Sequence, residues 1–530
     1  MKRTPKIDDK TRLDNKVCLF LFLIIASVLI LFSNGHYGGD GLETYLTAES
    51  IVLDGDLFIH DRPFEVEQMR YRKRGFVLDE GKFYTRQGLG VVLLLVPFYL
   101  LGHTISGFFS SIPRGYITQF FVSLSNPFIL ALLGVFLFKL LRAFGFKPKT
   151  SLYAVIIYSF CTMNIIYARS GFAEPAVALC LTLAVLYLLR YKDSGSIAYL
   201  FISALFLGYT IFIKKNSLLY LPSFTLYLVY LIKTHGAREK KALYIIKSGF
   251  AFLIPFAFYA LIILLQNYIL YGSMASTEFG SVSDMLSKTE SGGQAMKGVY
   301  YYLISSGKGY FIFNLVFIPA LFGIAGVFRK RKDTAIFIIS LLLFNFIFYV
   351  RIFVRGTLFS WGPRYLFPTL PLMAIFLAMF IAGSNTLKRK ITIAFFAAAG
   401  FLIQLPALFV SFSKFIFFVK EKLHLDEYMI NFMPELSPIR GSWFLLVSSM
   451  HNKLTGKALE FVFNPDTKFV QPIKESLAGF DTLDTWWANM LKVAPDMLCP
   501  VLLFVVLLLF IIIISSFKIR SILTRAEGTE

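Results

Sequence analysis

The sequence predicts an all-α polytopic membrane protein, from its composition, its long apolar runs and the placement of its basic residues. Of the 530 residues, 56% are hydrophobic and 16% are charged, whereas a soluble domain carries about 25% charged residues. Several apolar runs have roughly 20 residues, the length of a helix that crosses a hydrocarbon core. Val17–Ser33, Phe250–Leu270 and Pro500–Ser515 are examples. A bilayer offers no water to backbone N–H and C=O groups, so these runs must be helices.

The distribution of Lys and Arg predicts how the chain crosses the membrane. Candidate spans are Val17–Ser33 and stretches centred near residues 100, 130, 159, 181, 205, 225, 260, 318, 344, 373, 401 and 507. The most basic connections are Arg142–Lys149, Arg238–Lys247, Arg329–Lys332 and Lys388–Lys390, and such loops are normally cytoplasmic. They share one side with both basic termini only if the Gly- and Pro-interrupted segment 88–109 does not cross. We therefore expect about twelve transmembrane helices, cytoplasmic termini, and an interfacial or re-entrant helix at 88–109.

This topology divides the chain into three regions and places the unusual sequence on the outer side. Residues 1–411 form the main helical module, with a long first outer loop at 34–116. Residues 412–497 form a second outer region, and residues 498–530 are the last span and a cytoplasmic tail. The net charge of +21 follows from the basic inner loops and their attraction to anionic lipid, not from nucleic-acid binding. No Cys or His spacing predicts a disulfide framework or a metal site.

The first outer loop opens with acidic residues just after the first span. Asp40 and Glu43 lie in the segment Gly38-Gly39-Asp40-Gly41-Leu42-Glu43, whose glycines allow a tight turn. A partly desolvated carboxylate has a raised pKa and suits proton abstraction. The alternative is that both residues begin the next helix, where acidic residues favour the helix dipole.

A second acidic residue, Glu174, precedes Pro175 at the start of a later helix. A carboxylate at this depth is costly, and its default interpretation is functional. The alternatives are an ordinary helix cap or a salt bridge to Arg169.

Four cations on the outer side are candidates for holding a phosphate. They are Arg86, Lys214, Lys215 and Arg364. Positive charge on the outer side needs a reason, and an anionic ligand is one, whereas snorkelling or contact with lipid headgroups is the alternative. Tyr45, Tyr84 and Trp361 are candidates for contact with a sugar or acceptor, and interface anchoring is their ordinary role.

The order of these residues resembles the GT-C superfamily of membrane glycosyltransferases, and is most similar to its protein O-mannosyltransferase and aminoarabinose-transferase branch. The resemblance runs from residue 17 to about 385. It consists of an acidic residue after the first span, a Tyr-containing loop, an interfacial helix, a second acidic residue, a lysine at an outer helix end and a Gly-Pro-Arg-Tyr segment. Many relatives carry a Pro-Pro-Leu-like segment where this chain has Arg86-Gln87-Gly88-Leu89.

The resemblance implies an inverting glycosyltransferase of the bacterial inner membrane that needs no metal or other cofactor. A sugar would move from a polyprenyl-phosphate donor to a lipid, glycan or protein acceptor on the outer face. Asp40 matches the proposed base, Glu174 the second acidic position, and Lys215 or Lys214 the cation for the donor phosphate. Gly41 stands where some relatives have a second acidic residue, so Glu43 is expected to share that role.

Two other functions stay open. A surface-polysaccharide ligase or polymerase would also use a lipid-linked donor and a large outer region such as 412–497. A lipid or solute transporter, including a flippase, would place charges at mid-membrane depth and often shows internal repeats. Here most unusual charges lie at the outer edge, and no repeat is visible.

Overall fold

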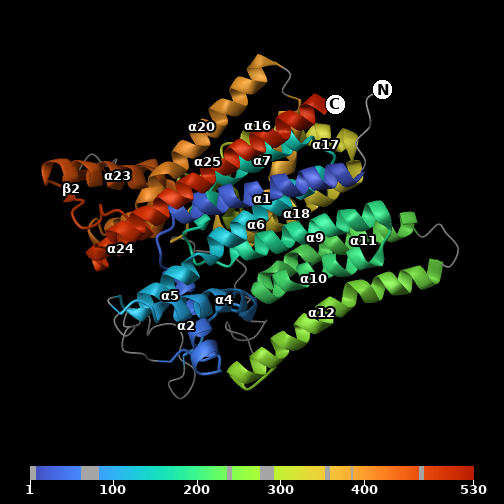
Figure 1. Cartoon of the computed structure of the whole chain (residues 1–530), viewed down its shortest axis with the longest axis horizontal. Coiled ribbons are helices and arrows are strands. Elements are labelled where there is room, and N and C mark those ends of the chain that lie inside the picture. The colour runs from blue at the N-terminus through green and yellow to red at the C-terminus, as the bar shows by residue number, and fades with distance from the viewer. Residues whose placement is uncertain are drawn as a thin grey trace.

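Long apolar helices form a bundle with a smaller folded unit at one end (Figure 1). The structure, a computed structural model, describes residues 7–60, 83–110, 112–235, 241–274, 292–352, 359–383, 386–464 and 471–529. Part of the predicted first outer loop, residues 61–82, lies outside the described residues. The predicted all-α polytopic class is confirmed.

Ten helical stretches in the described ranges are long and apolar enough to cross a membrane. They are built from α1 (Ile7–Leu31), α4 (Leu89–Ser106), α5 with α6 (Arg114–Ser123, Ser125–Ala143), α9 (Glu174–Ser194), η2 with α11 (Lys215–Tyr220, Leu221–His235), α12 (Lys241–Tyr271), α18 (Lys332–Ile352), η4 with α19 (Arg364–Thr369, Leu370–Ala382), α20 (Leu387–Phe409) and η6 with α25 (Pro495–Met497, Leu498–Thr529). Helix α10 (Ile197–Ile213) is apolar but shorter. The predicted number of about twelve spans stays a prediction.

Two of the predicted spans are broken helices. The stretch near 159 forms α7 (Pro148–Phe160) and α8 (Asn164–Tyr167). The stretch near 318 follows α14 (Gly292–Ile304) and divides into α15 (Tyr310–Phe313), α16 (Phe317–Ala320), η3 (Leu321–Gly323) and α17 (Ile324–Lys330). A broken helix leaves backbone groups that need partners. The second break supplies a partner to the first, because Met163 N donates a hydrogen bond to Asn314 Oδ1 at 3.0 Å.

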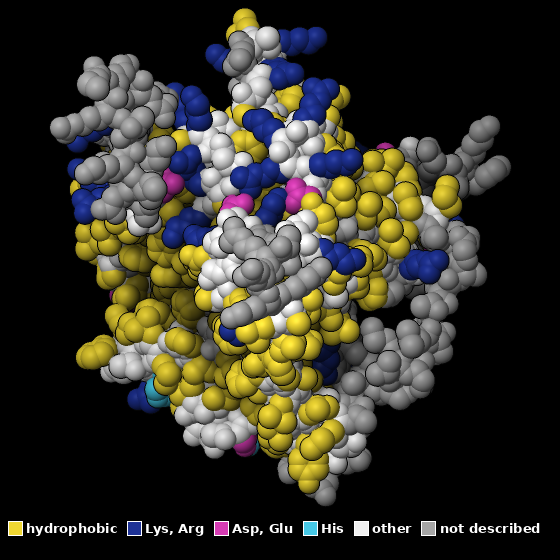
Figure 2. Space-filling model, turned by 90° about the vertical axis from the view of Figure 1, so that its right-hand side faces the viewer, with side chains coloured by type: hydrophobic (Ala, Val, Ile, Leu, Met, Phe, Trp, Pro, Cys, Tyr) yellow, Lys and Arg dark blue, Asp and Glu magenta, His cyan; other side chains and the backbone are white. Residues whose placement is uncertain are grey.

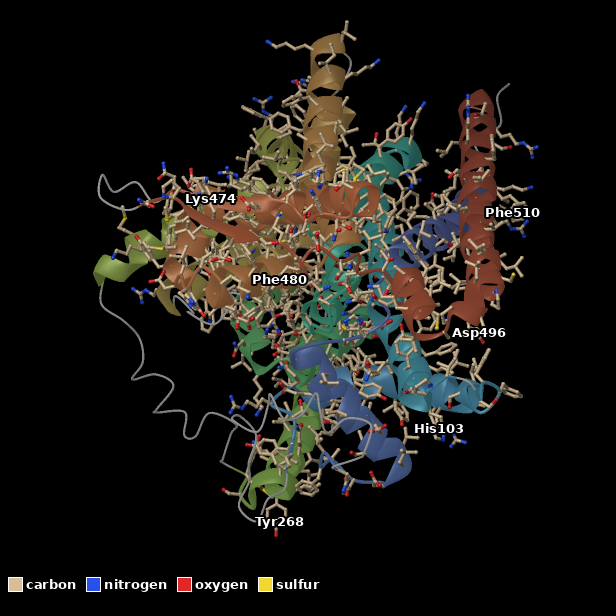
Figure 3. All side chains as sticks on the ribbon, turned by 90° about the vertical axis from the view of Figure 1, so that its left-hand side faces the viewer. His103, Tyr268, Lys474, Phe480, Asp496 and Phe510 are labelled. Atoms are coloured by element: carbon tan, nitrogen blue, oxygen red, sulfur yellow. The ribbon has the colours of Figure 1, made fainter. Side chains whose placement is uncertain are left out.

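Helix α4 occupies the segment for which an interfacial position is predicted. It packs against α2 (Asp40–Leu53) and α5, with Tyr99 and Val92 buried in a cluster that these helices share. Its residue His103 lies at the end of the molecule away from the chain termini, and the ribbon there runs across the direction of α25 (Figure 3). Leu89–Ser106 is nevertheless long and apolar enough to span, so the interfacial position stays a prediction.

Both chain termini lie at the same end of the bundle (Figure 1). Helices α1 and α25 pack side by side, and Trp487 Nε1, shortly before α25, donates to Leu31 O at the end of α1 at 3.2 Å. The two helices are therefore antiparallel. Lys and Arg side chains gather on the end that carries the termini (Figure 2), and Arg142 pairs there with Asp14 at 3.0 Å.

Residues 412–497 form a folded unit at the opposite end (Figures 1 and 3). The unit contains α21 (Phe412–Glu421), α22 (Glu427–Phe432), η5 (Pro434–Leu436), α23 (Pro438–Thr455), β1 (Glu460–Phe463), β2 (Ile473–Ser476) and α24 (Trp486–Val493). The two strands are antiparallel, with Glu460 opposite Ser476. Phe415, Phe418 and Phe461 pack in a separate hydrophobic cluster. This segment therefore has its own core and is more than a connecting loop.

Candidate active site

A cavity of about 510 Å³ lies where the helical bundle meets the 412–497 unit. Segments far apart in sequence form its walls: the loop after α1, the turn before α9, the turn before η4, the end of α20, the start of α21 and the segment before α24. Asp40 and Arg364 line it from the bundle, and Lys414 and Asp484 line it from the 412–497 unit. Phe172, Phe359, Phe412 and Phe417 supply aromatic surface. Mixed apolar walls with a few charged groups are typical of ligand pockets.

Three glycines bring Asp40 to this cavity. Gly39 precedes α2 with φ of 59°, a conformation that suits glycine. A Cβ on Gly41 would lie 2.5 Å from Gly171 Cα, and one on Gly171 would lie 2.3 Å from Gly41 Cα. The loop after α1 and the turn before α9 therefore touch through bare backbone. This contact explains a glycine at position 41.

Hydrogen bonds from the α5–α6 junction fix both loops. Tyr37 OH donates to Ser123 O at 3.2 Å, and Asn126 N donates to Tyr37 OH at 3.2 Å. The side chain of Asn126 donates to Phe172 O at 3.1 Å. One junction thus holds the segment before Asp40 and the segment before Glu174.

A chain of ion pairs joins the predicted acidic residues to two of the predicted cations. Arg364 Nη1 lies 2.7 Å from Asp40 Oδ2, and Arg364 Nε donates to Glu174 Oε1 at 2.7 Å. Lys214 Nζ donates to the same oxygen of Glu174. The Glu174 side chain is fully buried, whereas the Asp40 side chain is 34% exposed. The structure therefore joins four of the ten predicted site residues, and they form a charge-balanced group.

Aromatic rings cover the two cations of this group. The Arg364 guanidinium carbon lies 3.7 Å from the centre of the Phe172 ring. Lys214 Nζ lies 4.6 Å from the centre of the Tyr365 ring. Such contacts stabilise a partly desolvated cation. Gly362, with φ of 64°, and Pro363 form the turn that places Arg364 at the start of η4.

The other predicted residues on the first outer loop lie outside this group and do not line the cavity. Glu43 is buried within α2. Tyr45 is buried between α2, α4 and α5, with its OH 2.7 Å from Thr118 Oγ1. The Tyr84 ring packs edge-on against Tyr271 at 5.2 Å. Arg86 is exposed ahead of α4.

Lys215 and Trp361 also lie off the cavity wall. Lys215 begins η2, immediately after Lys214. Trp361 is buried and its Nε1 donates to Gln404 Oε1 at 2.7 Å. The surroundings of Tyr45 and Trp361 give both rings a packing role, so their predicted contact with sugar finds no support in their positions.

A second charged group was not predicted, because its members are far apart in sequence. Arg169 donates to Asp484 Oδ2 at 3.0 Å and to the backbone oxygens of Ala407 and Asp484. Glu174 is thus paired with Arg364 and Lys214, and the alternative of a salt bridge to Arg169 is wrong. Burial alone would raise the pKa of the Asp484 carboxyl, but the nearby charges of Arg169 and His36 hold it below its ordinary value of 3.8. In the described part of the chain, no three His, Cys, Asp or Glu side chains cluster as metal ligands would.

No protein-family model and no curated protein matches the chain. Among solved structures, it is similar to ArnT from Cupriavidus metallidurans bound to undecaprenyl phosphate, with 12% identity and a TM-score of 0.45 over 85% of this chain and 72% of that one. The apo form of the same protein is 10% identical, with a TM-score of 0.46 over 94% of this chain and 76% of that one. An oligosaccharyltransferase from Archaeoglobus fulgidus is 14% identical, with a TM-score of 0.44 over 87% of this chain and 61% of that one.

ArnT and the oligosaccharyltransferase are GT-C glycosyltransferases, the superfamily that the sequence resembles. Identities of 10–14% and TM-scores of 0.44–0.46 are too low to transfer a residue's role to this chain. The roles proposed below therefore rest on the residues of the cavity itself.

Proposed function

We propose that the protein is a membrane glycosyltransferase that moves a sugar from a polyprenyl-phosphate donor to an acceptor hydroxyl or amine in the 510 Å³ cavity. The observation that carries the proposal is the arrangement of Asp40 and Arg364 on its wall. Asp40 Oδ2 is held by Arg364, and Asp40 Oδ1 has no hydrogen-bond partner among the described residues. One oxygen orients the carboxylate, and the other is available to take a proton.

Arg364 is suited to the phosphate that leaves. Its Nε and Nη1 are held by Glu174 and Asp40, which fixes the plane of the guanidinium. Its Nη2 makes no hydrogen bond or ion pair with the residues that the structure describes, and a guanidinium has five N–H donors. A guanidinium held in this way is pre-organised to bind the oxygens of a developing phosphate anion.

The reaction would be a single displacement. The acceptor oxygen or nitrogen forms a bond to the anomeric carbon, the bond to the donor phosphate oxygen breaks, and the acceptor proton passes to Asp40. The anomeric centre is inverted, and polyprenyl phosphate leaves. Glu174 is fully buried behind Arg364, so we assign it a positioning role in place of the predicted catalytic one.

Charge distribution supports a site on the outer face. The cavity is formed by the end of α1 and the 412–497 unit, opposite the end that carries the termini and the gathered Lys and Arg (Figures 1 and 2). Basic ends of membrane proteins are cytoplasmic as a rule. The cavity would then open to the outer side, at the edge of the bilayer where a lipid-linked donor has its phosphate.

Purified full-length protein in lipid nanodiscs, supplied with a panel of undecaprenyl-phosphate-linked sugars and with glycolipid, glycan and peptide acceptors, tests the proposal. Transfer is expected with at least one pair. Asp40→Asn should lower the rate by about 100-fold or more, because it removes the base. Asp56→Asn, on an aspartate that bonds His60 and does not line the cavity, should leave the rate unchanged. Wild-type turnover by folded Asp40→Asn protein would overturn the assignment.

A further inference from the structure

Lys414 is a cation on the cavity wall that has no carboxylate partner. It lies in the first turn of α21 and lines the same cavity as Asp40 and Arg364. Its Nζ donates to Thr482 Oγ1. Within the described ranges, no Asp or Glu lies within ion-pair distance of it. Arg364 and Arg169, the other two cations on this wall, are each paired with carboxylates.

The surroundings of Lys414 leave its charge in excess. Two carboxylates, Asp484 and Asp481, act on it from a distance, and so do two cations, Lys492 and Arg169. Neither carboxylate lies within ion-pair distance, so no ion pair in the described part of the chain offsets the positive charge of Lys414. Asp484 is further committed to Arg169, and Asp481 accepts a hydrogen bond from Ser448 at 2.9 Å.

Holding an unpaired cation at a partly buried position costs free energy. Burial lowers the pKa of the Lys414 amine from its ordinary value of 10.5, because desolvation disfavours the charged form. Thr482 nevertheless fixes the amine at the wall. Ser411 and Ser413 line the cavity beside it, and the N-terminus of a helix also favours anions. A costly charge on the cavity wall, without a carboxylate partner among the described residues, is explained by an anion that binds in the cavity.

We propose that Lys414 binds a phosphate group carried by a substrate of this cavity. The proposal deepens the proposed function, because it assigns to the 412–497 unit a direct contact with substrate. The phosphate has two possible sources, the polyprenyl-phosphate donor or a phosphorylated acceptor. In both cases Lys414 acts as a point charge on a flexible stem that can follow the phosphate as it moves.

Binding experiments test this without requiring sugar transfer, so failure of the proposed function and failure of this inference can be told apart. Full-length protein in nanodiscs would be titrated separately with undecaprenyl phosphate and with glucose 1-phosphate, a soluble phosphate monoester that stands for an acceptor. Lys414→Gln should weaken binding of at least one probe by about tenfold or more, since a charge-assisted hydrogen bond is lost. Lys414→Arg should retain binding.

Lys422→Gln is the matched control, because Lys422 is an exposed lysine at the other end of α21. It should bind both probes as the wild type does. Loss confined to undecaprenyl phosphate identifies the donor as the source, and loss confined to the soluble phosphate identifies the acceptor. Thr482→Val removes the hydrogen bond that holds the Lys414 amine, so it should weaken binding of the same probe. This variant replaces Lys414→Gln if that protein does not fold. Wild-type affinity for both probes in folded Lys414→Gln or Thr482→Val protein would overturn the proposal.

Discussion

Replacement of Glu174 by Gln tests whether this buried carboxylate holds the candidate site together. Glu174 is fully buried, and its Oε1 accepts hydrogen bonds from Lys214 and Arg364. Arg364 would keep its pair with Asp40 in the variant. Among the described residues, Lys214 would keep its contact with the Tyr365 ring and no ion pair. One largely buried cation, with 19% of its side chain exposed, would therefore lose its only carboxylate partner in the described part of the chain.

Removal of one partner from a buried ion pair costs about 3–5 kcal/mol, so Glu174→Gln should lower the free energy of unfolding by about that amount. Equilibrium unfolding in mixed detergent and SDS micelles, followed by tryptophan fluorescence, would measure it. The double variant Glu174→Gln/Lys214→Met should recover a large part of the loss, because the unpaired charge is gone.

Glu427→Gln is the matched control for this prediction. Glu427 pairs with Lys420 at 3.7 Å, and both side chains are at least 40% exposed. An exposed pair contributes less than about 1 kcal/mol, so this variant should remain close to the wild type. The reasoning is refuted if Glu174→Gln is as stable as Glu427→Gln, or if adding Lys214→Met destabilises it further.

Three further predictions address the loop contact, the second charged group and the topology. Gly41→Ala should destabilise the fold by about 1–3 kcal/mol through overpacking against Gly171. Gly38→Ala, with nothing within 4 Å of its Cβ, should leave the free energy of unfolding unchanged. Equal destabilisation by the two changes would contradict the contact. The pKa of Asp484 is lower in the folded protein than its ordinary value of 3.8, so its stabilising effect is present above pH of about 4 and is lost as the pH falls through the folded pKa. Protease resistance of the 412–497 unit should therefore stay constant from pH 8 to pH 5 and fall below pH 4, with a smaller fall in Asp484→Asn, and identical acid profiles would count against this role. Single cysteines replacing Lys147 and Lys388 should react with a membrane-impermeant reagent from the side of the termini, and one replacing Asp56 from the other side; labelling of all three from one side would contradict the topology.

The membrane class and the position of Asp40 could be predicted from the sequence, because both depend on local properties. Length and apolarity of a run decide whether a helix can cross a bilayer. The glycines around Asp40 and the turn Gly362-Pro363 before Arg364 are visible in the chain, and each produces the bend that the structure shows. Polar residues at the ends of apolar runs pointed to Glu174 and Lys214 for the same reason.

Breaks in two predicted spans were missed because hydropathy measures composition and not continuity. The stretches near 159 and 318 are mostly apolar, and the contact between Met163 and Asn314 stabilises an interruption in each. Asn164 and Asn314, together with Pro319, were the visible signals. The predicted sugar contacts of Tyr45 and Trp361 stay predictions. Both rings are buried, and a buried aromatic in a helix bundle and one that faces a sugar look alike in sequence.

The sequence by itself determined that the chain forms apolar helices, with acidic and basic side chains at some of their ends, because helix length, hydropathy and glycine turns are local properties. Only the tertiary structure decided which charges meet. Glu174 pairs with Arg364, 190 residues away, and Arg169 pairs with Asp484, 315 residues away. These pairs exclude the nearer one between Arg169 and Glu174, and they leave Lys414 with an unpaired charge. Ion pairing depends on distance in space after packing, and no pattern along the chain carries that distance.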